Sequence, residues 1–302
     1  MSLDRLTADA ARREAVKALE AAGVDPADAR TEARALLKAA AGGSAAALIA
    51  RGREGVSPVV AARFAEMLAR RARRTPLAHI LGETAFWKFR LKTDARALIP
   101  RPETEEVANQ ALTLCPTDRP VRVLDLGVGT GALLFAVLVE RPLAFGVGLD
   151  RSEDALALAR ENAARLGLAA RCAFVCGDWL DAVGGPVDLV LANPPYIETE
   201  TLATLEPEVR DGDPRLALDG GVDGLAAYRR IGARLGAVTP PGRRAVFELG
   251  AGQGAAVKAA FDVNGSASVE IGQDVEGRDR WAIVRLEAAP VLRNRQKPVG
   301  NS

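Results

Sequence analysis

The feature that most constrains this chain is a repeated order of apolar strand, loop and helix from Val121 onward. "VRVLDLG" precedes a helix predicted to begin near Ala132, and "AFGVGLD" precedes the helical pattern "SEDALALARENAARLGL". "RCAFVCGD" and "VDLVLANPPY" continue the series, and a helix around Gly224–Leu235 leads to "RRAVFELG" and a further helix. Such alternation predicts an α/β domain with a mostly parallel sheet covered by helices on both faces.

The end of this series departs from the parallel pattern. "SASVEIG" and "RWAIVRLE" both read as strands, and the charged loop between them is too short to hold a crossover helix. Parallel neighbours need such a crossover, whereas antiparallel neighbours need only a short turn. These two strands are therefore predicted to form an antiparallel hairpin.

The N-terminal part of the chain reads as a small bundle of helices. Thr7 is a candidate cap for a helix over residues 8–22, and Asp25 caps a second helix with Pro26 at its first position. A third helix follows "SP" in "SPVVAARFAEMLARRARR". After it, "ETAFWKFRLKTDARALIP" alternates in the manner of a β-hairpin.

The length of 302 residues is sufficient for two domains of ordinary size. We expect a helical domain over residues 1–80, a hairpin linker over 81–105, and the α/β domain over 106–290. The polar tail over residues 291–302 is expected to be disordered.

Composition excludes several classes of protein. The formal net charge is only +1, so no overall field attracts the chain to nucleic acid or membrane. Three cysteines and one histidine, His79, form neither a disulfide framework nor a zinc site, and no metal is expected. His79 is interpreted as structural. The N-terminus has no apolar signal core, and no stretch is long and apolar enough to span a membrane, so we expect a cytoplasmic protein.

An arginine cluster, Arg70, Arg71, Arg73 and Arg74, ends the third predicted helix. The favoured interpretation is a solvated helix face. The alternative is a surface that contacts an acidic partner protein or RNA.

A glycine loop, "LDLGVGTGALL", lies between the first strand and the first helix of the α/β domain. Its glycines let the backbone approach a ligand closely and adopt positive φ without steric strain. Asp150 ends the next strand, where a carboxylate can accept hydrogen bonds from ribose hydroxyls. Asp125, just before the loop, adds a carboxylate near the cationic end of such a ligand. On this pattern alone a structural turn or a dinucleotide enzyme stays open, but no Walker-type Gly-Lys-Ser/Thr occurs.

Two further segments bear on the ligand. "FELGAGQGAAV" repeats the glycine spacing late in the chain and is followed by Glu270 on a strand, but too little chain remains for a second ligand motif. We interpret it as a tight strand-to-helix turn. In "CGDW" the acidic side chain can reach an adenine amino group, and Trp179 can pack on the ring. The alternative for Trp179 is a half-buried core residue.

The segment "NPPY", Asn193 to Tyr196, follows the fourth strand at the sheet edge where open α/β sheets bind ligands. Its two prolines have no N–H, so the turn offers carbonyl acceptors with few competing donors. The Asn193 side chain adds a carbonyl, and Tyr196 adds a flat aromatic wall. This arrangement suits a planar NH₂ group, and accepting from both of its hydrogens stabilises positive charge on the nitrogen during attack on a methyl sulfonium.

In this order, "DLGVGTG", Asp150 and "NPPY" resemble class I methyltransferases that act on planar amino nitrogens. "RRARRTPLAHILGETAFWKFRLKTDARALIPRPETEEV" and "EVRDGDPRLALDGGVDGLAAYRRI" narrow the resemblance to the PrmC/HemK family, the glutamine methyltransferases of peptide-chain release factors. The resemblance runs from about Phe64 to Leu286, and more loosely over the N-terminal helices. It implies a Rossmann-like seven-stranded sheet with a helical substrate-recognition domain.

The resemblance also implies a cofactor and a set of site residues. The cofactor is S-adenosyl-L-methionine, with S-adenosyl-L-homocysteine as product, and the substrate is the glutamine of a Gly-Gly-Gln loop. Cofactor binding is implied for Gly127, Val128, Gly129, Thr130, Gly131, Asp150, Trp179 and Asn193. The glutamine pocket is implied for Asn193, Pro194, Pro195 and Tyr196, with Asn193, Pro194 and Tyr196 as catalytic residues.

Three alternatives remain at this point. A glutamine methyltransferase for a ribosomal protein shares NPPY but tends to lack the "PRPETE" form. A nucleic-acid amino methyltransferase of the N6-adenine type needs a basic recognition region and aromatics for a flipped base. A scaffold that only binds cofactor does not require the intact Asn193–Tyr196 motif. The favoured expectation is a monomer that docks transiently on release factors and holds no stable nucleic acid.

Overall fold

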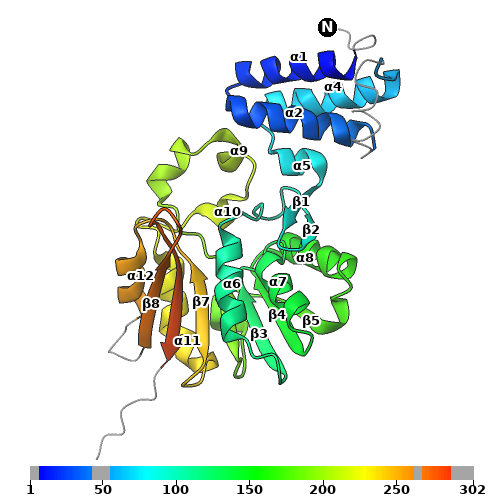
Figure 1. Ribbon diagram of the computed structural model, residues 1–302. Helices are drawn as coiled ribbons and strands as arrows, with labels where there is room; N and C mark the ends of the chain where they lie inside the picture. The colour runs from blue at the N-terminus through cyan, green and yellow to red at the C-terminus, as the bar shows by residue number, and fades with distance from the viewer. Residues whose placement is uncertain (1–6, 43–54, 262–266, 287–302) are drawn as a thin grey trace, which may run out of the picture.

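The computed structural model describes residues 7–42, 55–261 and 267–286. They form a helical N-terminal bundle and a larger layered domain with a seven-stranded sheet, joined by a short hairpin (Figure 1). The α/β architecture expected from the sequence is confirmed.

The N-terminal bundle is built from alanine-rich amphipathic helices. Two predicted caps are present: the Thr7 side chain accepts a hydrogen bond from Ala10 N at 3.3 Å, and Asp25 accepts one from Ala27 N at 2.7 Å. The buried faces pack around large residues such as Phe64, which is 1% exposed. The helices are α1 (Ala8–Ala21), α2 (Pro26–Ala40), α4 (Pro58–Ala72) and α5 (Leu77–Leu81). Within the described ranges, no helix has both the length and the apolar character needed to cross a bilayer.

A two-stranded hairpin leads out of the bundle. Its strands, β1 (Glu83–Phe86) and β2 (Phe89–Lys92), pair antiparallel within the predicted linker. The Trp87 amide in the turn donates to Glu105 at 2.7 Å, and its indole donates to Glu140 at 2.9 Å. These bonds tie the hairpin to the layered domain. The predicted disordered tail, residues 291–302, lies outside the described residues.

The sheet has the strand order β5-β4-β3-β6-β7-β9-β8. Five strands run parallel, β9 runs antiparallel to β7, and β8 pairs antiparallel with β9. The predicted terminal hairpin is therefore confirmed. The strands are β3 (Val121–Leu126), β4 (Ala144–Asp150), β5 (Cys172–Cys176), β6 (Leu189–Ala192), β7 (Arg244–Glu248), β8 (Ala267–Gln273) and β9 (Asp279–Leu286).

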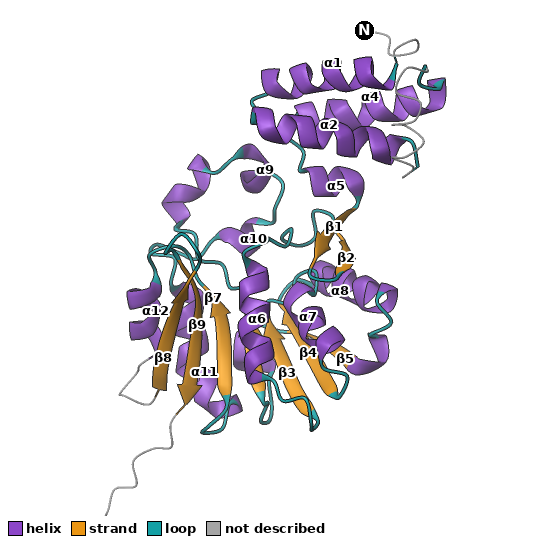
Figure 2. Ribbon diagram, viewed as in Figure 1, coloured by secondary structure: helices purple, strands orange, loops and turns teal. Residues whose placement is uncertain are grey.

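Helices cover both faces of the sheet (Figure 2). One core contains residues of α6 (Thr104–Leu114), α7 (Ala132–Glu140) and α8 (Glu153–Arg165), and the other contains residues of α11 (Ala226–Val238) and α12 (Gly254–Phe261). Helix α7 is apolar almost all round, because it is enclosed between the sheet and α6. The short elements η1 (Ala169–Arg171) and η2 (Trp179–Ala182) flank β5.

The chain between β6 and α11 forms a bridging segment, residues 199–219, that the strand–helix pattern did not predict. It contains η3 (Thr199–Thr204), α9 (Pro207–Arg210) and α10 (Arg215–Leu218). Helix α9 lies between the bundle and the sheet (Figure 1). The segment therefore connects the two parts of the molecule.

The arginine cluster holds this bridging segment, and its interpretation as a solvated helix face is wrong for two of its members. Arg71 is 5% exposed and binds Glu32 at 2.7 Å and Glu208 at 2.6 Å. Arg74 donates to Glu206 at 2.8 Å and to the Gly23 carbonyl at 2.8 Å. The acidic partners of these two arginines lie in the same chain: Glu32 belongs to α2, Glu208 to α9, and Glu206 directly precedes α9.

Candidate active site

The glycine loop follows β3 at the carboxyl edge of the sheet. Gly127, Gly129 and Gly131 all have positive φ, at 72°, 51° and 90°. The amides of Gly127 and Val128 donate to the Leu149 carbonyl at 2.8 and 2.9 Å, which holds the loop against β4. A Cβ at Gly131 would overlap the Phe135 ring, so this glycine is needed for the entry into α7.

Asp150 ends β4 and contacts the same loop. Its Oδ2 accepts from the Gly129 amide at 3.0 Å, and its Oδ1 accepts from the Ser152 amide at 3.0 Å. Burial raises the pKa of Asp150, although these amide donors act to lower it. The carboxylate thus shapes the loop and still has lone pairs for hydroxyl donors.

Asp125 lies beneath the loop and is 2% exposed. Its Oδ2 accepts from the Leu134 amide at 3.2 Å. Burial raises its pKa to about 8, so the carboxyl is mostly neutral at pH 7 in the ligand-free protein. A cation bound beside it would favour its ionised form.

The segment after β5 forms another wall of the site. Asp178 Oδ2 binds Arg230 at 2.8 Å, while Asp178 Oδ1 has no hydrogen-bond partner within the described parts of the chain. The Trp179 ring lies 3.8 Å from the point where a Cβ on Gly127 would stand. Trp179 also packs on the core, so its side chain can be a half-buried core residue and a wall of the ligand cavity at the same time. A free carboxylate oxygen beside an indole fits a heteroaromatic ring that carries an amino group.

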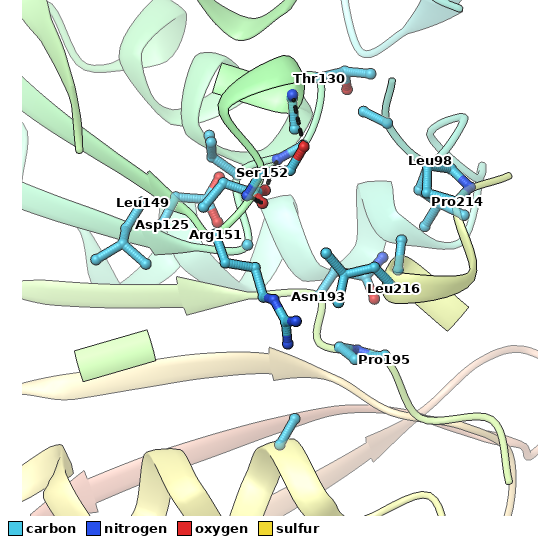
Figure 3. A pocket seen from close by; sticks show the side chains of 18 of the residues that line it. Leu98, Asp125, Thr130, Leu149, Arg151, Ser152, Asn193, Pro195, Pro214 and Leu216 are labelled. Atoms are coloured by element: carbon cyan, nitrogen blue, oxygen red, sulfur yellow. Dashed lines mark hydrogen bonds between the residues drawn. The ribbon is translucent and has the colours of Figure 1, made fainter. Parts of the chain in front are cut away.

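These elements enclose a cavity of about 280 Å³. Figure 3 shows Asn193 and Pro195 across the cavity from Asp125 and Ser152. Of the predicted site residues, those that line the cavity are Gly127, Val128, Gly129, Thr130, Asp150, Trp179, Asn193 and Pro195. Gly131, Pro194 and Tyr196 are not among the residues that line it.

The NPPY turn leaves β6 with its acceptors directed away from the ladder. Asn193 Nδ2 donates to Thr104 Oγ1 at 3.4 Å, so the side-chain carbonyl points elsewhere. Pro194 is buried, and no hydrogen bond reaches its carbonyl oxygen from any described residue. The turn can therefore accept from both hydrogens of one amide NH₂ group.

Tyr196 fixes the end of the turn. Its hydroxyl donates to Glu248 Oε1 at 3.4 Å, and its carbonyl accepts from Gln253 Nε2 at 2.9 Å. Burial raises the pKa of Tyr196, with the nearby Glu248 acting in the same direction. Both partners belong to the second glycine-spaced segment, in which the Gly250 amide donates to Gln253. That segment lies outside the cavity lining, in agreement with its interpretation as a turn, but it also supports NPPY, which the sequence reasoning missed.

Two groups of cavity residues were not identified as site residues. One ends at Thr104, the first residue of α6, and the other lies on the bridging segment around α10. Asp213 joins them, because it accepts from the Ile99 amide at 3.1 Å and from Arg101 at 2.6 Å. Their signals were "IPRPETE" and "DGDPRLAL", which carried the family resemblance but no residue role. The residues are Arg96, Ala97, Leu98, Pro100, Thr104, Pro214, Leu216, Ala217 and Asp219.

The donors and acceptors in the cavity fit S-adenosylmethionine. Asp150 suits ribose hydroxyls, Asp178 and Trp179 suit adenine, and Asp125 suits a cationic end. No cluster of potential metal-binding side chains occurs within residues 7–42, 55–261 and 267–286. His79 is not part of the cavity lining, and burial lowers its pKa.

Comparisons with known proteins identify the family and the fold. The family model "PrmC N-terminal domain" matches residues 10–82, and the family model "Methyltransferase domain" matches residues 117–217. The solved hMettl16 catalytic domain, in complex with MAT2A 3'UTR hairpin 6, is 16% identical with a TM-score of 0.53. It covers 74% of this chain and 83% of that chain, which indicates a shared fold alone.

Curated relatives match over nearly the whole chain. The "Release factor glutamine methyltransferase" of Caulobacter vibrioides is 45% identical over 263 residues, which are 87% of this chain and 90% of the relative. The protein of the same name from Cereibacter sphaeroides is 45% identical over 279 residues, which are 92% of this chain and 98% of the relative. The chain therefore belongs to the release factor glutamine methyltransferases, a family of S-adenosylmethionine-dependent enzymes.

Proposed function

We propose that this chain methylates the side-chain amide nitrogen of the glutamine in the Gly-Gly-Gln motif of peptide-chain release factors. The observation that carries the proposal is that Asn193 and Pro195 border the same cavity as the glycine loop and Asp150. A methyl donor and an acceptor nitrogen held in line gain a proximity effect, which reaches roughly 7–11 kcal/mol in favourable cases.

We assign the cofactor to the loop side of the cavity. The bound S-adenosylmethionine supplies an electrophilic methyl group on a positively charged sulfur, and S-adenosylhomocysteine is the product. Asp150 holds the ribose hydroxyls, Asp178 accepts from the adenine amino group, and Trp179 packs on the adenine ring. The full set that we assign to the cofactor is Gly127, Val128, Gly129, Thr130, Gly131, Asp150, Asp178, Trp179 and Asn193.

The NPPY turn acts on the glutamine. An amide nitrogen is a poor nucleophile because its lone pair is delocalised into the neighbouring carbonyl. Asn193 Oδ1 and the Pro194 carbonyl accept from its two N–H bonds, which favours pyramidal geometry and stabilises positive charge as it develops. Pro195 and Tyr196 form the walls that orient the amide. As the new N–C bond forms, the bond between methyl and sulfur breaks; the nitrogen is then cationic and loses its proton to water, so no strong base is required.

The choice of a release factor as substrate rests on the curated relatives, whose names state it for those proteins. We assign substrate recognition to residues 1–80, the linker to residues 81–105, and methyl transfer to residues 106–290. We infer that the enzyme is a monomer that docks transiently on its protein substrate in the cytoplasm, where peptide release takes place.

The first experiment tests the substrate. The protein is incubated with methyl-labelled S-adenosylmethionine and, separately, with a release factor, a ribosomal protein and DNA. We expect label on the release factor alone, and a Gln→Ala change in its Gly-Gly-Gln loop should abolish labelling. Label on the ribosomal protein or on DNA would assign the chain to one of the alternative substrates.

The second experiment tests the turn. Asn193→Ala should retain the fold, as judged by circular dichroism, and lower kcat by about 100-fold, since one preorganised acceptor is commonly worth 10²–10³. Asn109, an exposed asparagine on α6, provides the matched control, and Asn109→Ala should leave kcat unchanged. Equal turnover in both variants would refute the role of Asn193.

A further inference from the structure

Glu248 is a buried carboxyl group directly behind the NPPY turn. It is the last residue of β7, lies opposite Trp281 of β9, and is 3% exposed. Its Oε1 accepts from the Tyr196 hydroxyl at 3.4 Å, whereas its Oε2 has no hydrogen-bond partner in the part of the chain that the structure describes. An unsatisfied buried carboxyl oxygen is costly, so its retention here needs a cause.

The group that faces Glu248 from α6 is the Thr104 hydroxyl. Thr104 is 3% exposed, and it lies near enough to the Glu248 carboxyl group to act to lower its pKa. The same hydroxyl oxygen accepts from Asn193 Nδ2 at 3.4 Å. Thr104 therefore stands between the buried carboxyl and the amide that we assign to catalysis.

We propose that Glu248 is a positioning residue, which fixes the orientation of the Asn193 amide through the Thr104 hydroxyl. This inference rests on the proposed function. A hydroxyl has one hydrogen, so when Thr104 donates it to Glu248 Oε2, only its lone pairs remain for Asn193. Asn193 must then point Nδ2 at Thr104 and Oδ1 at the substrate nitrogen.

The opposite orientation of the Asn193 amide would prevent it from accepting a hydrogen bond from the substrate. With the amide flipped, Nδ2 would face the substrate NH₂ group, and two donors would meet. The series of hydrogen bonds from the Glu248 carboxylate through the Thr104 hydroxyl to the Asn193 amide also polarises the Asn193 carbonyl, since hydrogen bonds in series strengthen one another where water is excluded. Glu248 therefore stabilises, from a distance, the positive charge that develops on the substrate nitrogen.

The ionised form of Glu248 only accepts hydrogen bonds, whereas the neutral form carries a proton that it can donate to Thr104 and so reverse the hydrogen bond. Burial raises its pKa to about 7, Thr104 and Tyr196 act to lower it, and of the more distant charges Glu103 raises it and Arg280 lowers it. Tyr228 of α11 donates to the Glu248 main-chain carbonyl at 2.8 Å and leaves the carboxyl group free. Turnover should therefore fall as the pH drops through about 7.

The test is Glu248→Gln in the full-length enzyme, with a release factor and labelled S-adenosylmethionine as substrates. The glutamine keeps the shape of the side chain, but its NH₂ group can donate to Thr104, which reverses the direction of that hydrogen bond. We expect kcat to fall about tenfold or more, while KM for the release factor and Kd for S-adenosylmethionine stay within about twofold. The rise of kcat through about pH 7 should disappear in this variant. Glu270→Gln, an exposed change on β8, is the matched control and should behave as wild type.

Two Thr104 variants separate positioning from simple packing. Thr104→Ser keeps the hydroxyl and should retain kcat within about threefold, whereas Thr104→Val should match Glu248→Gln. The double variant Thr104→Val/Glu248→Gln should be no slower than either single variant, because each substitution interrupts the same series of hydrogen bonds. If Glu248→Gln fails to fold, the pH profile of Thr104→Val carries the test, because that variant should lack the rise of kcat through about pH 7 only if Glu248 acts through the hydroxyl.

The outcomes distinguish this inference from the proposed function. No labelling of the release factor by the wild-type enzyme would remove the proposed function itself. An active wild type, together with a Glu248→Gln or Thr104→Val variant of unchanged kcat and unchanged pH profile, would overturn the positioning role.

Discussion

The buried contact of Arg71 allows a quantitative prediction. Its guanidinium binds Glu32 through two nitrogens, at 2.7 and 3.1 Å, and Glu208 through a third, at 2.6 Å. The Arg71 side chain is 6% exposed, and those of Glu32 and Glu208 are 13% and 17% exposed. Arg71→Met keeps much of the side-chain volume but removes the charge and all three hydrogen bonds.

The size of the loss in stability depends on which carboxylate has no partner once Arg71 is replaced. Breaking a buried ion pair by removing one partner typically costs about 3–5 kcal/mol. Arg74 still binds Glu208 in the variant, so mainly Glu32 loses its partner, and the low end of that range applies. We expect Arg71→Met to lower the free energy of unfolding by about 3 kcal/mol, and Arg71→Met/Glu32→Gln to recover about 1 kcal/mol of that loss.

The assay is urea unfolding followed by circular dichroism at pH 7. Arg73→Met is the control, because Arg73 is exposed on the same helix end, and it should change the free energy of unfolding by less than about 0.5 kcal/mol. The reasoning would be refuted if Arg71→Met and Arg73→Met unfolded at the same urea concentration.

Three further predictions concern the site. Gly224 has a φ of 70°, and a Cβ there would overlap the Tyr196 carbonyl, so Gly224→Ala should lower kcat about tenfold. The control is Gly242→Ala, which has a similar φ of 82° but open space around the added Cβ, and it should leave kcat unchanged. Equal labelling rates for the two variants would contradict this prediction. Because burial raises the pKa of Asp125 to about 8, the free energy of unfolding of the wild type should fall as the pH rises from 4 to 8. In urea unfolding of the cofactor-free protein, Asp125→Asn should fall less steeply over that range, because only other buried carboxyl groups such as Glu248 then contribute. Trp179→Ala should raise Kd for S-adenosylmethionine by about tenfold in titration calorimetry, and an unchanged Kd would exclude stacking on adenine.

The fold could be predicted from the sequence where local pattern and tertiary structure agree. The caps at Thr7 and Asp25 are local signals, and the strand–loop–helix repeats follow from burial on both faces of a sheet. The bridging segment could not be predicted in this way, because its short helices are held by Arg71 and by Asp213 rather than by a periodic apolar face.

The candidate site could likewise be predicted only where its residues are close together in the sequence. The glycine loop and NPPY carry their chemistry in adjacent residues and could be predicted. The cavity residues on the bridging segment could not, because Asp213 is bound to Ile99 and Arg101, which are 114 and 112 positions away. Glu248 also escaped notice, since a glutamate that ends an apolar strand shows nothing of the side chains that α6 and the NPPY turn place beside it.

The position of β9 inside the sheet determines when the sheet can be completed during synthesis. β9 joins β8 to β7, and it also lies along the strand that ends in Glu248. A growing polypeptide that lacks residues 279–286 cannot close this part of the sheet, however completely its earlier strands have assembled. Strand β7 therefore keeps an unpaired edge in the nascent chain until synthesis has passed residue 286.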